Sequence, residues 1–107
     1  MVEVDFIKEV VSKWVLDISE FCTIYLYGSY SDNTATEHSD IDLAIKFHDL
    51  DIRNGTLKMF DHQNQWEKIL KERLGKTVHI ELFDELTQTV RGGVSKSSIL
   101  LYTSMEK

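Results

Sequence analysis

Two short groups of residues in this chain could do chemistry together. One offers hydrogen-bond donors suited to phosphate, and the other offers carboxylates suited to a metal ion. Gly28-Ser29 closes an apolar run, and Asp40-Ile41-Asp42 follows after a gap of ten residues. Glycine permits close approach of the backbone, and the free N–H groups and the hydroxyl of such a turn are suitable donors to a phosphate. In an extended segment, the two aspartates project to the same side because they are two positions apart.

Two carboxylates on one side of a strand repel each other unless a cation lies between them. Mg²⁺ prefers oxygen ligands and usually shares its coordination shell with substrate phosphates. Gly-Ser alone is a common turn and Asp-x-Asp alone is commonly a solvated strand edge, but their combination between two predicted strands favours a site for a metal-bound phosphate. An EF-hand and a P-loop are excluded, since neither the acidic spacing after Asp32 nor a Gly-Lys-Ser/Thr sequence is present.

Hydrophobic spacing predicts the elements that position these residues. Apolar residues at helical spacing predict an amphipathic helix over 6–18. A β-branched and aromatic run predicts a strand over 23–27, and the polar stretch 31–40 indicates a loop or a short helix. Alternation over 41–47 predicts a half-buried strand with Asp42 on its polar side.

The second half of the chain continues this pattern. A polar linker over 48–55 precedes a second helix over 57–74, which stops at Gly75. Alternation predicts a third strand over 77–83, with His79 and Glu81 on the same face.

Two short helices are expected near the end of the chain, one around 84–90 and another over 94–102, after a pair of glycines. The predicted order is therefore helix, strand, strand, helix, strand, helix. This order favours an α/β (α+β) fold in which helices pack on one small mixed β-sheet. The length of 107 residues fits a single domain over 1–107.

Composition narrows the class of protein. The net charge of −6 disfavours a broad nucleic-acid surface, which needs clustered Lys and Arg. No apolar stretch reaches the roughly 20 residues that a membrane span needs, and the N-terminus lacks a signal-peptide pattern. The single cysteine, Cys22, is expected to be a buried thiol, and the four histidines lack zinc-ligand spacing. We therefore expect a cytoplasmic protein without membrane contact.

The Gly28-Ser29 and Asp40-Ile41-Asp42 groups and the gap between them resemble the motif of the nucleotidyltransferase superfamily that includes DNA polymerase β. The flanking segments LYGSY and SDIDLAI are similar to its minimal nucleotidyltransferase (MNT) branch. The resemblance implies the polymerase β-like nucleotidyltransferase fold. It also implies a helical partner of the HEPN type, often as antitoxin and toxin.

The same resemblance implies transfer of a nucleoside monophosphate to an acceptor hydroxyl, which is expected to lie on the HEPN-type partner. The expected donor is ATP or another nucleoside triphosphate, with AMP as the transferred group and two Mg²⁺ ions as cofactors. The alternative is a weak or inactive antitoxin that neutralises its partner by contact alone. Nucleic acid is a disfavoured acceptor, and the prediction leaves room for a homo-oligomer.

Residue by residue, the resemblance implies that Gly28 and Ser29 hold the triphosphate and that Asp40 and Asp42 bind metal. The family also uses a third carboxylate on a later strand, for which Glu81 is the predicted residue, as metal ligand and acceptor of the hydroxyl proton. Another register places His79 there, and a neutral nitrogen would weaken Mg²⁺ binding. Spacing alone does not choose between these two residues, since both lie on one face.

Two further positions bear on phosphate binding. Many minimal members have arginine after Gly-Ser, whereas this chain has Tyr30 and no Lys or Arg over 30–38. This difference predicts weaker triphosphate binding unless metal compensates. Lys46 shares a strand face with Asp42, where it serves either as a phosphate contact or as a solvated edge lysine.

Overall fold

The structure is a computed structural model that describes residues 3–31, 35–83 and 98–104. Within these ranges it contains two helices, one short 3-10 turn and four strands. In chain order they are α1 (Val4–Ile18), β1 (Cys22–Tyr27), η1 (Gly28–Tyr30), β2 (Ile41–Phe47), α2 (Ile52–Leu74), β3 (Val78–Leu82) and β4 (Ser98–Thr103).

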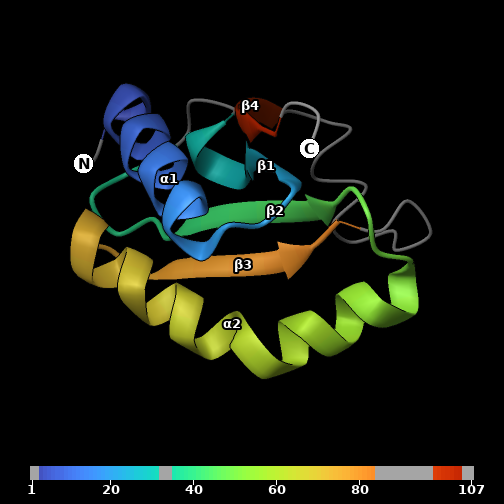
Figure 1. Cartoon of the computed structure of the whole chain (residues 1–107). Helices are drawn as coiled ribbons and strands as arrows, with labels where there is room; N and C mark the ends of the chain where they lie inside the picture. The colour runs from blue at the N-terminus through green and yellow to red at the C-terminus, as the bar shows by residue number, and fades with distance from the viewer. Residues whose placement is uncertain (1–2, 32–34, 84–97, 105–107) are drawn as a thin grey trace.

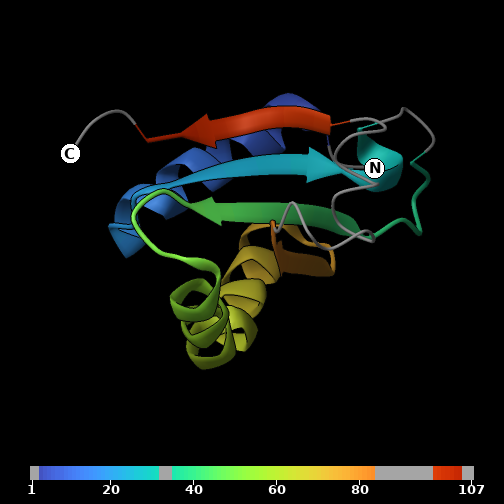
Figure 2. The same cartoon turned by 90° about the vertical axis from the view of Figure 1, so that its right-hand side faces the viewer.

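The four described strands form one mixed sheet in the order β3-β2-β1-β4. β2 and β3 run parallel, whereas β1 is antiparallel to both β2 and β4. Both helices contribute buried residues to the same core as one face of the sheet, and Figures 1 and 2 show them on the same side of it. The predicted fold, helices packed on a small mixed sheet, is confirmed.

α1 forms because its apolar residues recur at helical spacing, as predicted. Its buried positions are Ile7, Val11, Trp14 and Val15, one stripe of the helix that faces the core. The indole ring of Trp14 meets that of Trp66 from α2 edge to face, with the ring centroids 5.7 Å apart. This aromatic pair joins the two helices in the middle of their shared layer.

α2 begins earlier than predicted, because part of the expected 48–55 linker is helical. The Asp51 side chain caps the helix by accepting a hydrogen bond of 2.8 Å from the Asn54 backbone N–H. This polar cap starts the helix before Leu57, the first apolar residue of the helical pattern. The periodicity of apolar residues alone could not indicate this earlier start. The predicted stop at Gly75 is confirmed, and this residue has a left-handed φ of 73°.

Side chains of α2 also bond to the outer edge of β3. Gln63 Nε2 donates to the backbone oxygen of Ile80 at 2.6 Å, and Glu67 Oε2 accepts from the Ile80 N–H at 2.7 Å. Ile80 itself is fully buried. These bonds satisfy the backbone groups of an edge strand and fix the position of β3 along the sheet.

The predicted helix over 94–102 is wrong where the structure describes it, because Ser98–Thr103 forms strand β4. Leu101 is 2% exposed and lies at a register shift in the pairing of β4 with β1. A short apolar run fits either a strand or a buried helix, and here pairing with the edge of β1 decides. The helix expected around 84–90 and the start of the one at 94 lie outside the described residues.

Neither described helix has the length and apolar character required to cross a lipid bilayer.

Cys22 lies at the start of β1, and its thiol is fully buried, as the sequence predicted. Burial, with a smaller contribution from the charge of Glu20, raises the pKa of the thiol to about 12, and Lys58 opposes the shift. The thiol therefore stays protonated at pH 8.

We expect Ellman's reagent to leave the native protein unmodified at pH 8 and to modify one thiol per chain in guanidinium chloride. Reaction of the native protein at the rate of a free thiol would contradict this burial.

Candidate active site

The two halves of the Gly-Ser and Asp-x-Asp motif meet where β1 ends and β2 begins. Tyr27 and Asp42 are paired in the antiparallel register of these strands, and Gly28 follows with a left-handed φ of 75°. A Cβ atom at Gly28 would lie 2.6 Å from Asp42 Oδ2. Because carbon and oxygen cannot approach so closely without bonding, a side chain at this position would push the Asp42 carboxylate out of its place.

The turn after Gly28 is anchored on both sides. Ser31 donates two hydrogen bonds to the Gly28 oxygen, at 3.1 Å from its backbone N–H and 2.9 Å from its hydroxyl. The Tyr30 side chain is 5% exposed and belongs to the core. Ser29 lies between these anchors and is partly exposed. The uncharged Tyr30 thus holds the turn in place from within the core.

The parallel register of β2 and β3 determines which side chains of β3 face the Asp-x-Asp group. Asp42 pairs with His79, and Ala44 pairs with Glu81. The alternate positions of both strands enter the core beneath the helices, so Asp42, His79 and Glu81 all lie on the opposite face of the sheet. His79 is therefore directly across from Asp42, and Glu81 is one alternation farther along.

We call the site formed by Gly28, Asp42 and His79, where β1 ends and β2 begins, the corner. Asp40 belongs to it through its contact with His79. The distance between Asp40 Oδ2 and His79 Nε2 is 3.0 Å, and both side chains are about half exposed, at 49% and 48%. Just before it, the Thr36 N–H donates to the Ser39 hydroxyl at 2.8 Å, and Lys76 Nζ donates to the Glu37 backbone oxygen. These contacts hold the loop that brings Asp40 to the corner.

The charges at this corner act on one another. Burial raises the pKa of Asp42; the positive charge of His79 opposes this shift and the negative charge of Asp40 adds to it. The hydrogen bond to Asp40 is the main cause that raises the pKa of His79, with further support from nearby carboxylates and opposition from burial. The two aspartates thus favour the protonated form of His79.

Tyr27 is a residue of this corner that the sequence analysis missed. Burial, followed by the charges of Asp42 and Glu81, raises its pKa to about 12. The phenol therefore remains a neutral hydrogen-bond donor beside two carboxylates. The signal was present, because alternation along 23–27 places Tyr27 on the polar side of β1, the side that Asp42 occupies on β2.

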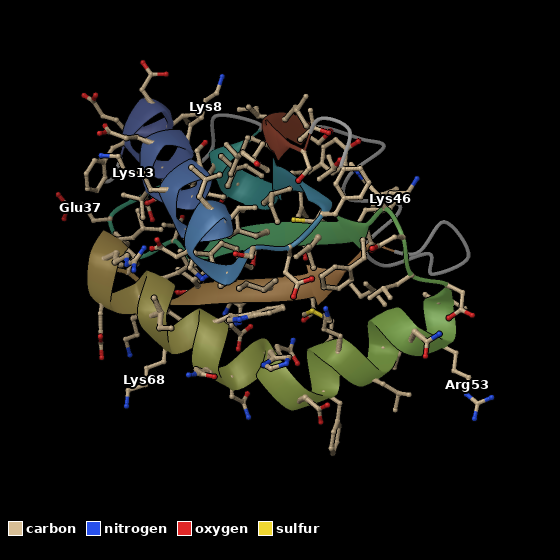
Figure 3. The ribbon with its side chains drawn as sticks, viewed as in Figure 1. Lys8, Lys13, Glu37, Lys46, Arg53 and Lys68 are labelled. Carbon is tan, nitrogen blue, oxygen red and sulfur yellow. The ribbon has the colours of Figure 1, made fainter. Side chains whose placement is uncertain are left out.

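The basic side chains labelled in Figure 3 lie away from this corner. Figure 3 shows Lys46 at the end of β2 remote from Glu37, and Lys8, Lys13, Arg53 and Lys68 projecting outward from the helices. Lys46 Nζ lies 5.8 Å from the centroid of the Phe83 ring. The role of Lys46 in phosphate binding therefore stays a prediction, and its described contact is with an aromatic ring.

The donor set fits a hard divalent cation that shares its shell with phosphate. Two carboxylates lie next to a glycine whose missing side chain leaves the approach to Asp42 open. Across the residues that the structure describes, no three acidic, histidine or cysteine side chains already converge as a formed metal site. Asp40 is instead hydrogen-bonded to His79, and Asp42 Oδ2 lies next to Gly28.

Replacement of Gly28 by alanine tests the close contact with Asp42, and Gly75 offers a matched control. Both glycines have a left-handed φ, but a Cβ at Gly75 would meet nothing within 4 Å. We expect Gly75→Ala to lower the free energy of unfolding by about 1 kcal/mol through backbone strain alone. Gly28→Ala should lose roughly 0.5–1.5 kcal/mol more, because its Cβ forces the Asp42 carboxylate out of its preferred rotamer. Urea unfolding of both variants measures the difference, and equal losses would refute the contact.

Comparison with known proteins identifies the family and the fold of this chain. The sequence model of the family described as "Polymerase beta, Nucleotidyltransferase" matches residues 9–107. A search of curated protein sequences finds no match.

Three solved structures of toxin–antitoxin systems contain chains with the same fold. A toxin–antitoxin crystallised with AMP-PNP has a TM-score of 0.71 and 23% identity, over 91% of this chain and 73% of that chain. A mutant of the toxin–antitoxin MntA-HpeT has a TM-score of 0.68 and 21% identity, over 91% and 73%. The tri-AMPylated HEPN toxin of Shewanella oneidensis in complex with MNT antitoxin gives 0.64 and 20%, over 94% and 72%. These likenesses establish the fold, and the family match over most of the chain establishes that it belongs to the polymerase β nucleotidyltransferase family.

Proposed function

We propose that this chain transfers AMP from ATP to a hydroxyl group of a HEPN-type partner protein, as the antitoxin of a toxin–antitoxin pair. The observation that carries the proposal is the contact of Asp42 with Gly28, which joins a phosphate-binding turn to an acidic pair within a nucleotidyltransferase fold. Asp40 lies at the same corner through its bond to His79.

Structures with the same fold support the choice of donor and acceptor. One is a toxin–antitoxin with AMP-PNP, and another is an AMPylated HEPN toxin in complex with MNT antitoxin. ATP and a HEPN-type protein are therefore the first substrates to test for this chain. The buried free thiol of Cys22 suits the reducing cytoplasm in which we expect the pair to act.

Each residue of the corner has a role in this proposal. The backbone after Gly28 and the hydroxyl of Ser29 bind the triphosphate, since the turn is fixed and partly exposed. Asp40 and Asp42 would hold two Mg²⁺ ions, with Glu81 as the third carboxylate. Bound magnesium neutralises phosphate charge and thereby favours displacement of pyrophosphate.

The remaining chemistry is proton transfer and orientation. The acceptor oxygen forms a bond to the α-phosphorus as the bond to the pyrophosphate oxygen breaks, and the hydroxyl proton passes to the carboxylate of Glu81. Glu81 faces the same side of the sheet as Asp42 and acts electrostatically on Tyr27. The neutral Tyr27 phenol donates a hydrogen bond that orients the acidic side chains or the nucleotide.

Substitution of Asp42 tests the proposal. Incubation of the wild-type protein with ATP, Mg²⁺ and a HEPN-type partner should add AMP-sized mass to the partner, measured by intact mass spectrometry. Asp42→Asn keeps the shape but removes the charge, so we expect labelling to fall by at least about a hundredfold. Asp61→Asn, the same change on an exposed face of α2, is the matched control and should label normally. Equal labelling by wild type and Asp42→Asn would refute the metal-binding role.

A second function is a binding module that neutralises its partner by contact. The observation that favours it is His79, a neutral or positive group directly across from Asp42. Isothermal titration calorimetry with Mg-ATP separates the two functions, since a nucleotidyltransferase must bind its donor. We expect saturable binding by the wild type and much weaker binding by Asp42→Asn. Absence of nucleotide binding, together with intact affinity for the partner, would favour the module.

A further inference from the structure

His79 occupies the position across from the Asp-x-Asp group, and the fold leaves little freedom to replace it there. The α2 side chains of Gln63 and Glu67 both bond to the backbone of Ile80. A slip of β3 that brought Glu81 opposite Asp42 would break both bonds. Since strand residues rise by about 3.3 Å each, Glu81 lies roughly 6.6 Å farther along β3 than His79.

The geometry of the His79 contact resembles that of two ligands on one metal ion. His79 Nε2 and Asp40 Oδ2 are 3.0 Å apart. In an octahedral shell with bonds of about 2.1 Å, neighbouring ligand atoms are also about 3.0 Å apart. A divalent ion about 2.1 Å from each atom would lie to one side of the line that joins them, so both side chains would turn toward it while their separation stays nearly the same.

The surroundings allow the remaining ligand to join. Asp42 is paired with His79 across the strands, and the side chains of Asp40 and His79 are half exposed. In the described ranges these groups do not yet form a metal site. Asp42 and His79 lie on paired strands, and Asp40 is already hydrogen-bonded to His79, so the three side chains start from neighbouring positions.

We propose that His79 is a metal ligand together with Asp40 and Asp42, so that this site prefers a divalent transition ion such as Mn²⁺ to Mg²⁺. Mg²⁺ favours an all-oxygen shell, whereas an imidazole nitrogen is a better ligand for transition ions. The inference rests on the proposed function, because it assigns the metal of the same nucleotide site. It replaces Glu81 by His79 as the third protein ligand and leaves Glu81 available to accept a proton.

Electron paramagnetic resonance of bound Mn²⁺ tests this without any measurement of activity. Pulsed spectra of the wild-type protein at pH 8.0 should show coupling between Mn²⁺ and an imidazole nitrogen. We expect His79→Asp to bind Mn²⁺ without this coupling. His62→Gln retains it, since His62 stacks on Trp66 in α2, and Glu81→Gln also retains it.

Competition between the two ions provides the second readout. The wild type should bind Mn²⁺ at least about tenfold more tightly than Mg²⁺, measured from the free Mn²⁺ signal. His79→Asp should tighten Mg²⁺ binding by at least about tenfold, because it adds a negative oxygen ligand. Unchanged Mg²⁺ affinity in this variant would overturn the proposal.

The outcomes separate this inference from the proposed function. Mn²⁺ binding without nitrogen coupling, combined with AMP transfer to the partner, overturns the role of His79 and leaves the transferase in place. Nitrogen coupling that is lost in His79→Asp supports the metal site even if no AMP is transferred. Absence of both metal binding and AMP transfer overturns both.

Discussion

The close contact between the Asp42 carboxylate and the Gly28 backbone is the constraint on which the site depends. It requires a residue without a side chain at Gly28, and it requires β1 and β2 to be antiparallel neighbours. The buried Tyr30 and the hydrogen bonds of Ser31 hold the turn against the strand. The same few residues therefore hold the turn against the sheet and place the Asp42 carboxylate in the site.

Charge balance explains the arrangement of the other polar groups. Two aspartates near a partly buried corner repel each other, and they favour the protonated form of His79, which is hydrogen-bonded to Asp40. Tyr27 stays neutral under the same field, because burial and both carboxylates disfavour a phenolate.

The sequence predicted α1, the first three strands, the glycine stop of α2 and the approach of the two motif halves, because each follows from local periodicity or turn chemistry. It missed β4, since a short apolar run is ambiguous until its partner strand is known. It also left His79 and Glu81 open as alternatives. Their order relative to Asp42 depends on the bonds of Gln63 and Glu67 to Ile80, which join distant parts of the chain. The role of Glu81 stays a prediction.

Those same bonds from α2 affect how another protein can associate with this one. An exposed edge strand commonly recruits a foreign strand through its free backbone groups. At the middle of β3, the amide and carbonyl of Ile80 are already occupied by a helix of the same chain. Extension of the sheet is therefore blocked on that side, and an incoming polypeptide must recognise side chains there instead of backbone.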